Sequence, residues 1–397
     1  MGGRVEGFIK GSLRSYINIV TGGFTALLFL SMVESAHSTV LSLIKNEFSL
    51  NYTLSGALTS SYFLGYALGQ IPWGYIADRI GPTRTISLST FGTALSLILF
   101  GLIGEIWQII MLRFLSGLLG AGIFVSTVKL TSICFSPLVR GTVLGILNIG
   151  TNLGLAIASW FFPHLSLIFG WRHPLICFGM VGGIFAGVAK LSLGNRDLFH
   201  YTQVSNSLGE IFKSKNFWIL ASLNFIRLGV YNTFVAWLPV FLHEGCGLDL
   251  LTAGTTFTFF SLAGIISSPL GGFVSDHTNE KFTIFFSFIS LALALYLVEL
   301  EAFPILAIII LLGLFTNFMR SPMFTLISKL WGDALTGVIA GTHNTFAAIG
   351  AFTLPLCFGY LIDRLASYYF GWIFLLLLVT IGAHVSLFIK HSNIVNC

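Results

Sequence analysis

Long apolar stretches alternate along the chain with short connections that are polar or charged. A helix that crosses a membrane needs about 20 predominantly apolar residues. Dividing the chain at its charged and turn-rich points leaves twelve stretches of roughly that length. Their approximate cores are residues 16–44, 53–77, 84–103, 106–130, 141–166, 172–193, 216–242, 251–275, 282–299, 303–328, 335–361 and 371–389. Because the short alternating segments of a membrane β-barrel are missing, the pattern predicts an all-α membrane protein with 12 transmembrane helices.

Composition supports a membrane protein and excludes several other classes. Asp, Glu, Lys and Arg make up only 9% of the 397 residues, whereas a soluble globular chain carries about 25% charged residues. The net charge is +5, without a basic run long enough to bind nucleic acid. Five cysteines are scattered singly, which indicates neither a zinc site nor a disulfide framework. We therefore expect no metal and no cofactor, and the lipid bilayer as the surrounding medium.

Lys and Arg are distributed unevenly between the connections. If the N-terminus lies inside, 14 of the 20 fall on the cytoplasmic side and three, Lys45, Arg172 and Arg364, fall outside. Basic residues are enriched in the cytoplasmic connections of membrane proteins. We therefore predict a multi-pass protein of the plasma membrane with both termini in the cytoplasm.

The second half of the chain repeats the first. Gly74 and Asp78 at the end of the second span recur as Gly272 and Asp276 at the end of the eighth. The fifth and eleventh spans share one spacing of small residues around an asparagine, seen as Gly141, Gly145, Asn148 and Gly154 and again as Gly337, Gly341, Asn344 and Gly350. Such duplication is characteristic of secondary transporters, whose substrate site lies between the repeats. We therefore predict six-helix bundles at residues 1–193 and 216–397, joined by a cytoplasmic linker at residues 194–215.

Several motifs resemble those of the major facilitator superfamily. The loop GQIPWGYIADRIGPTRT after the second span is similar to the signature loop of that family, with GGFVSDHTNEKF at the equivalent place in the second half. RFLSGLLGAG in the fourth span and FGWRHP after the fifth are also similar to family motifs. With WLPVFL in the seventh span, the chain looks most like bacterial and archaeal organic-anion porters. The resemblance implies the major facilitator fold, with two six-helix bundles that rock against each other.

The resemblance also implies a cytoplasmic gate. Asp78 ends a helix, where a negative charge is unfavourable beside the negative end of the helix dipole and needs a cationic partner. In the family, this acid pairs with basic residues and a neighbouring helix end and latches the gate of the outward-open state. The expected gate residues are Gly74, Asp78, Arg79, Gly81, Arg84 and, in the second half, Asp276, and Arg140 is a further candidate partner. The alternative is a plain turn whose charges only set the orientation.

Four charged residues, Glu34, Arg113, Arg227 and Arg320, fall inside the predicted spans. A charge at the centre of a membrane helix costs about 2.5 to 3.5 kcal/mol on insertion scales. These side chains should therefore face a cavity or each other. The depths of Glu34 and Arg113 differ by only about 5 Å, so an ion pair between them is allowed.

Glu34 is the candidate proton carrier. Burial favours the neutral form of a carboxyl group and a neighbouring Arg113 favours the charged form, so substrate or helix movement can switch its protonation. Several proton-coupled members of the family it resembles carry an acid in the first helix and an arginine at the start of the fourth-helix motif. His37, one turn from Glu34, is a second candidate. The alternatives are a structural ion pair that holds two helices together and, for His37, a packing role.

Three arginines against one glutamate leave an excess positive charge within the spans. This excess favours an anionic substrate held by guanidinium groups. The candidate substrate-binding residues are Arg113, Arg227, Arg320, Asn148 and Asn344, with possible additional contacts from Asn224, Asn232, Tyr231 and Trp237. For Arg320 the alternative is a side chain that reaches toward the inner surface.

Enzyme motifs are missing from the sequence: there is no P-loop, no His-Glu-x-x-His and no Gly-x-Ser-x-Gly. We therefore expect no enzyme activity and no catalytic residue, and transport driven by a gradient rather than by ATP. The sequence favours a monomeric, proton-coupled symporter of a small organic anion that works by alternating access. One alternative is a proton-driven exporter of amphipathic compounds, for which the 39 Phe residues could line a cavity. A different class is a non-transporting membrane receptor with the same fold.

Overall fold

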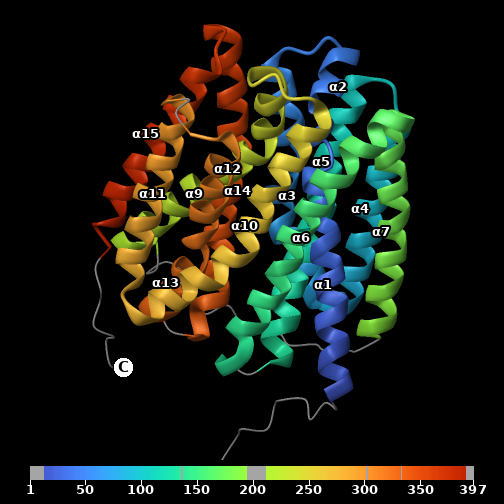
Figure 1. The fold of residues 1–397 in the computed structure, drawn as a ribbon. Helices are drawn as coiled ribbons and strands as arrows, with labels where there is room; N and C mark the ends of the chain where they lie inside the picture. Colours follow the sequence, from blue (N-terminus) through green and yellow to red (C-terminus); the bar gives the residue numbers. More distant parts are fainter. Residues whose placement is uncertain (1–12, 136, 195–211, 301–302, 332, 390–397) are drawn as a thin grey trace, which may run out of the picture.

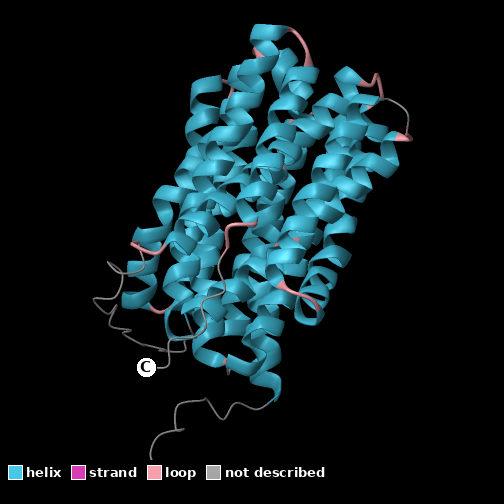
Figure 2. Cartoon of the chain, turned by 90° about the vertical axis from the view of Figure 1, so that its left-hand side faces the viewer, coloured by secondary structure: helices cyan, strands magenta, loops and turns pink. Residues whose placement is uncertain are grey.

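The chain folds into a bundle of long helices that run up and down side by side (Figure 1). The computed structural model describes residues 13–135, 137–194, 212–300, 303–331 and 333–389. This part of the chain consists of helices and short connections (Figure 2). Most of the predicted linker, residues 195–211, lies outside the described residues, so its boundaries stay a prediction.

Twelve helical crossings, as predicted, account for the described residues. The first half contains α1 (Leu13–Ser35), the short turn η1 (Ser38–Val40), α2 (Leu41–Glu47), α3 (Tyr52–Ile80), α4 (Pro82–Leu102), α5 (Ile106–Cys134), α6 (Pro137–Phe169) and α7 (Arg172–Leu193). The second half contains α9 (Lys215–Val240), the turn η2 (Phe241–Gly245), α10 (Leu250–His277), α11 (Glu280–Leu300), α12 (Ile305–Phe318), α13 (Arg320–Trp331), α14 (Asp333–Leu365) and α15 (Tyr368–Ser386). Eleven of these crossings are long and apolar enough to span a membrane. The other, α3, has 29 residues but carries more polar and small side chains.

The connections gather at two ends of the bundle. We call one of them the basic end: α1 begins and α15 ends there, and it carries Arg79, Arg84, Lys129, Lys190, Lys215, Lys281 and Lys329. The other, where α2 meets α3, is the opposite end (top of Figure 1). This separation of charge is the one on which the predicted orientation depends.

The two halves repeat the same packing. In the first half α3 packs on α5, α1 on α6 and α4 on α7; in the second half α10 packs on α12, α9 on α14 and α11 on α15. A Cβ added at Gly154 would lie 2.2 Å from the carbonyl oxygen of Leu28, and one at Gly350 would lie 2.1 Å from that of Phe225. Glycine allows helix backbones to approach closely in membranes. The repeat in sequence is therefore a repeat in packing, in which α9 is equivalent to α1.

The halves meet through α3 against α14 and α6 against α10. Near the opposite end, a Cβ added at Gly56, Gly254 or Gly359 would lie within 2.9 Å of a main-chain oxygen of the other half. Toward the basic end, no described atom lies within 4 Å of a Cβ position at Gly145 on α6 or at Gly341 on α14. The halves are therefore pressed together at the opposite end, whereas the described residues make no such close contact at these two glycines.

Two of the predicted spans are interrupted. The first, predicted over residues 16–44, stops as α1 at Ser35 and resumes as α2 at Leu41. The tenth, predicted over residues 303–328, breaks at Met319 between α12 and α13. Pro322 explains the second break, because it has no amide hydrogen to donate to the carbonyl of residue 318 and its ring crowds that turn. The apolar pattern had indicated both spans without their interruptions.

We predict that Gly117→Ala destabilises the protein, since a Cβ there would lie 1.8 Å from the carbonyl oxygen of Tyr62 on α3. Overpacking of this kind costs about 1 to 3 kcal/mol, and the measurement is the unfolding temperature of the detergent-solubilised protein. Gly183→Ala is the matched control, because Gly183 has nothing within 4 Å of its Cβ position. An equal unfolding temperature for the two variants would contradict the packing of α5 on α3.

Candidate functional site

Arg113 on α5 connects three helices at the interruption of the first crossing. Its guanidinium is 0% exposed and donates to the main-chain carbonyl oxygens of Val33 at 2.8 Å and Glu34 at 3.0 Å, in the last turn of α1. Its Nε donates to the carbonyl oxygen of Leu58 on α3 at 3.3 Å. The last carbonyls of a helix lack intrahelical donors and form the negative end of its dipole. A buried cation at this point therefore stabilises the place where α1 stops.

Glu34 is half-buried at this helix end. Among the described residues, no hydrogen bond or ion pair is found for its carboxylate, although the charges of Arg113 and Arg320 act on it. Arg113 thus meets Glu34 through the main-chain carbonyl rather than through the side-chain ion pair that the sequence allowed. The physical reason is that the end of α1 exposes carbonyl groups that need a donor. The carboxylate is therefore not held by a hydrogen bond from any described residue.

His37 belongs to the turn after α1, because the helix ends at Ser35 rather than continuing for another turn. The ring is 0% exposed, and its Nε2 lies 2.7 Å from Oγ1 of Thr59 on α3. Its Nδ1 has no partner in the described part of the chain. His37 therefore connects the end of α1 to α3. It lies three residues after Glu34, and its Nδ1 is not used in a hydrogen bond with any described residue.

Arg227 and Arg320 bring positive charge from the second half. Arg227 on α9 is 8% exposed, and its Nε donates to Oδ1 of Asn224 over a long 3.4 Å. Arg320 begins α13 directly after the helix break, and its Nη2 donates to Oδ1 of Asn148 on α6 of the first half at 2.5 Å. The ion pairs found among described residues involve neither arginine. Buried cations without an anion are costly, so the arrangement is suited to an anionic ligand.

Arg320 interacts electrostatically with both Arg227 and Glu34. Tyr231 on α9 interacts with all three charged groups. Residues from both halves therefore converge on one region at the junction between the halves.

Neutral donors and acceptors complete this region. Tyr66 on α3 interacts with Gln70 on the same helix and with Asn344 on α14 of the other half. Within the described residues, Gln70 Nε2, the Tyr62 hydroxyl and Asn344 Nδ2 are buried without a hydrogen-bond partner. Buried polar atoms are nearly always paired in folded proteins, so these groups are available to a ligand or to water. Sequence analysis missed Tyr66 and Gln70, although the polar character of the second span was a signal for them.

A cleft opens beside Arg227 in the second half. Residues from α9, α13 and α14 line it: Asn224, Arg227, Met323, Phe324, Ile327, His343 and Asn344. His343 is 1% exposed and its Nε2 has no partner in the described part of the chain. The cleft therefore combines a guanidinium, two amides and an imidazole with apolar side chains, as small-molecule sites commonly do.

Two of the additional contact candidates have structural roles instead. Trp237 is 0% exposed, and its Nε1 donates to the carbonyl oxygen of Pro355 at 2.9 Å. Asn232 is also 0% exposed and donates to the carbonyl oxygen of Leu228 at 3.0 Å on its own helix. The Trp237 ring also packs against Tyr52 of the first half, with ring centroids 5.9 Å apart, whereas Asn232 Oδ1 is buried without a partner among the described residues.

Asp78 lies at the basic end and forms an ion pair with Lys129 on α5. Both residues belong to the first half. Lys129 was not among the partners that the sequence suggested, because α5 brings it to Asp78 only in the folded structure. Gly74 precedes Asp78 by one turn, and a Cβ there would make only an ordinary contact, 3.8 Å from Val125.

The other predicted gate residues of the first half lie around the turn between α3 and α4. Gly81 has φ +88°, a conformation that glycine adopts without steric cost. The guanidinium of Arg79 lies 4.5 Å from the centre of the Tyr75 ring, and Arg84 is exposed. The side chain of Arg140 lies outside what the structure describes.

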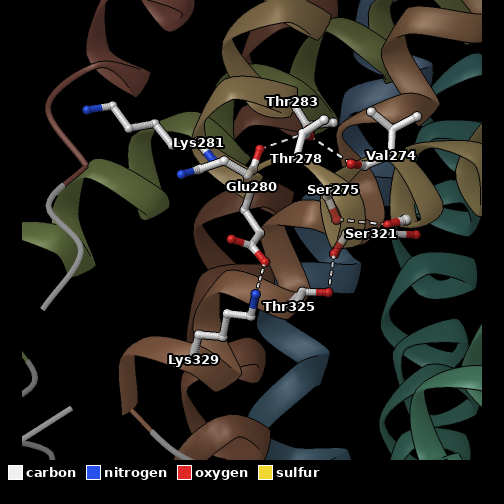
Figure 3. A network of polar contacts seen from close by, with 11 residues as sticks. Val274, Ser275, Thr278, Glu280, Lys281, Thr283, Ser321, Thr325 and Lys329 are labelled. Carbon is white, nitrogen blue, oxygen red and sulfur yellow. Dashed lines mark hydrogen bonds and ion pairs between the residues drawn. The ribbon is translucent and has the colours of Figure 1, made fainter. Parts of the chain in front are cut away.

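The second half places its ion pair differently. Asp276 is exposed at the end of α10, whereas Glu280 at the start of α11 is 3% exposed and pairs with Lys329 on α13 (Figure 3). Lys329 stands near the position in the repeat that Lys129 occupies in the first half. An acid at the start of a helix is favoured by the helix dipole. Sequence analysis named Asp276 and missed both members of this pair.

Comparison with known proteins identifies the sequence family. The sequence profile of the Major Facilitator Superfamily matches residues 23–355. The probable sulfoacetate transporter SauU of Cupriavidus necator is 24% identical over 403 residues, which covers 94% of each chain. The probable L-galactonate transporter of Escherichia coli K12 is 24% identical over 424 residues, which covers 98% of this chain and 93% of the relative.

Solved structures with the same fold include a bacterial homolog of the human lysosomal transporter Spinster. Its inward-facing, unoccupied form has a TM-score of 0.75 at 17% identity, covering 95% of this chain and 97% of that chain. The inward-facing, occupied form has a TM-score of 0.77 at the same identity and coverage. At this level of identity the likeness concerns the fold alone.

We predict that Arg113→Gln lowers the unfolding temperature, because the carbonyls of Val33 and Glu34 lose a charged donor inside the membrane. Hydrogen bonds to charged groups contribute about 1.5 to 3 kcal/mol each. Arg79→Gln is the control and should change stability little, since its arginine lies over a tyrosine at the basic end. If both variants unfold at the wild-type temperature, Arg113 does not hold the end of α1.

Proposed function

Because the chain belongs to the Major Facilitator Superfamily, we propose that it is a secondary active transporter that couples a small organic anion to a proton. One observation carries the proposal: Arg227 and Arg320 form no ion pair among the described residues, and the charge of Arg320 acts on Glu34, whose carboxylate has no hydrogen bond in the same part of the chain. The basic end faces the cytoplasm in this proposal, with both termini there, and a monomer in the cell membrane is the working unit.

Arg227 is the principal anion-binding residue. A carboxylate or sulfonate accepts two parallel hydrogen bonds from one guanidinium. Among the described residues, the Arg227 guanidinium makes one hydrogen bond, from its Nε to Asn224 over a long 3.4 Å. Binding would supply the missing negative charge to a cation that is 8% exposed. Relatives named as transporters of sulfoacetate and galactonate support an organic acid as the substrate class.

Neutral groups of the site bind the remainder of the substrate. Tyr66, Gln70 and Asn344 present hydroxyl and amide groups from both halves, two of them with unpaired nitrogen atoms. Polar groups of this kind fix the orientation of a small molecule and give specificity. A substrate bound by these groups would contact α3 of the first half and α14 of the second half at the same time.

Glu34 is the proton-carrying residue, and Arg320 links it to the substrate. The charge of Arg320 favours the charged form of Glu34. An anion bound to Arg320 screens that charge and so favours proton uptake by Glu34. By linkage, a proton on Glu34 favours anion binding to the same degree. Arg113 holds the end of α1 and thereby the position of Glu34.

The arrangement of the halves supports alternating access. They are pressed together at the opposite end, whereas no described atom lies within 4 Å of a Cβ position at Gly145 on α6 or Gly341 on α14 toward the basic end. This arrangement corresponds to a site that faces the cytoplasm. The bond from Arg320 to Asn148 joins the halves beside the site. A substrate that takes over Arg320 competes with this bond, so binding can alter how the halves are held.

Purified protein in liposomes should accumulate a carboxylate or sulfonate when a pH gradient is imposed. Glu34→Gln should abolish accumulation driven by the gradient but retain exchange of labelled for unlabelled substrate, because exchange requires no net proton transfer. Glu105→Gln, which changes an exposed acid at the opposite end, is the control. Concentrative uptake that survives in Glu34→Gln would contradict the proton role, and accumulation of no anion from the panel would contradict the proposed substrate class.

Arg227→Gln should weaken substrate binding about tenfold to a hundredfold, because a charge-assisted hydrogen bond contributes about 1.5 to 3 kcal/mol. The measurement is the substrate concentration that raises the unfolding temperature half-maximally. Arg364→Gln is the matched control, since Arg364 is exposed and contacts only the Tyr360 side chain in the described structure. Unchanged affinity in Arg227→Gln would remove Arg227 from the site.

A further inference from the structure

Glu244 connects the two halves at the opposite end. It lies in η2, directly after α9, and its Oε2 accepts hydrogen bonds from Nζ of Lys45 at 2.6 Å and from the hydroxyl of Tyr52 at 2.8 Å. Lys45 and Tyr52 belong to the first half. Tyr368 of the second half donates to the same oxygen at 3.4 Å. The side chains of Lys45 and Glu244 are only 16% and 19% exposed, so water screens this ion pair weakly.

Asp363 makes a second connection between the halves. It lies near the end of α14, and its carboxylate accepts from the main-chain amides of Tyr52 at 2.9 Å and Thr53 at 2.7 Å. The Thr53 hydroxyl donates to it as well, at 2.5 Å. Amides in the first turn of a helix lack intrahelical acceptors and form the positive end of the dipole. A carboxylate of the second half therefore caps α3 of the first half.

This cap is additional to the one that α3 already has. Asn51 precedes α3, and its Oδ1 accepts from the amide of Leu54 at 2.8 Å. The equivalent helix of the second half, α10, is capped by its own neighbour Asp249, which accepts from the amides of Leu251 and Thr252. Since α10 forms with a local cap alone, Asp363 is not needed to start α3. The contacts of Asp363 instead hold the second half against the first half.

We propose that Glu244 and Asp363 form an outer lock, made with Lys45, Tyr52 and Thr53, that holds the opposite end shut and opens in each cycle. The proposal goes beyond substrate and proton binding and rests only on the alternation of two states. Every contact of the lock with the first half is charge-assisted, and such bonds are about twice as strong as neutral ones. Breaking and re-forming these bonds therefore sets the equilibrium between the state that is closed at the opposite end and the state that is open there.

Asp363 also gives the lock a mechanical connection to the other end. Asp363 joins α3 to α14, and each of these helices extends the full distance between the two ends of the bundle. Asp78, near the basic end of α3, is paired within its own half by Lys129 in this state. Helix α3 is therefore tied to α14 at the opposite end and carries an ion pair within its own half at the basic end. Opening the lock would let α3 and α14 separate at the opposite end.

The test measures the distance between the halves at the opposite end. Spin labels at Glu105→Cys and Phe303→Cys, in a variant whose native cysteines are replaced, report this distance by pulsed electron resonance. Both positions are in connections at that end, one in each half. Glu244→Gln and Asp363→Asn should each raise the ratio of long-distance to short-distance molecules on the order of tenfold, as expected for loss of a charge-assisted bond.

A second set of variants removes the partners from the first half. Lys45→Met should shift the distances in the same direction as Glu244→Gln. The double variant should shift them less than the sum of the two, since both remove one interaction. Thr53→Val removes only the hydroxyl donor to Asp363. It replaces Asp363→Asn in the distance measurement if Asp363→Asn does not elute as a folded protein.

Matched controls separate a lock from a general loosening of that end. Glu47→Gln removes an ion pair with Arg172, 2.6 Å long and at the same end but within the first half. Asp249→Asn weakens a cap within the second half. The proposal is overturned if the lock variants keep the wild-type distances or if the controls shift them equally. The distances require no substrate, so a failure to find anion uptake leaves this result unaffected.

Discussion

A helix that stops inside a membrane leaves main-chain groups that water cannot satisfy, and the functional parts of this protein are built around such ends. Arg113 supplies donors to the carbonyls at the end of α1 and so places Glu34 at the junction of the halves. The break at Met319 makes Arg320 the first residue of a new helix. At the opposite end, an exposed carboxylate, that of Asp363, accepts from the amides at the start of α3. Charge is thus located where the helical hydrogen-bonding pattern is interrupted.

The scaffold is symmetric, but its site is not. Matching glycine contacts make α1 and α9 equivalent, which sets Leu28 against Phe225. In that alignment the counterpart of Glu34 is Tyr231, and an apolar leucine stands opposite Arg227. The two halves share the same helix packing, while the acid lies in one half and two of the cations in the other. The acid and these two cations therefore reach the junction from different halves.

The two ends of the molecule are held by different kinds of contact. At the opposite end, carboxylates of the second half reach the first half, whereas Asp78 and Glu280 at the basic end pair within their own halves. Between them, the bond from Arg320 to Asn148 crosses the junction beside the site. A ligand that changes the partners of Arg320 would thus act between an end with contacts across the halves and an end whose ion pairs lie within each half.

Sequence alone determined the membrane class, the twelve crossings, the internal repeat and the identity of the buried charges, because hydropathy and charge are local properties of the chain. It also placed Glu34, Arg227 and Arg320 within the membrane. Only the tertiary structure decided their partners: a carbonyl for Arg113, Asn148 for Arg320, Lys129 for Asp78 and Lys329 for Glu280. These pairs join residues far apart in the sequence, and which atoms meet depends on where the helices break and how closely glycines let them approach.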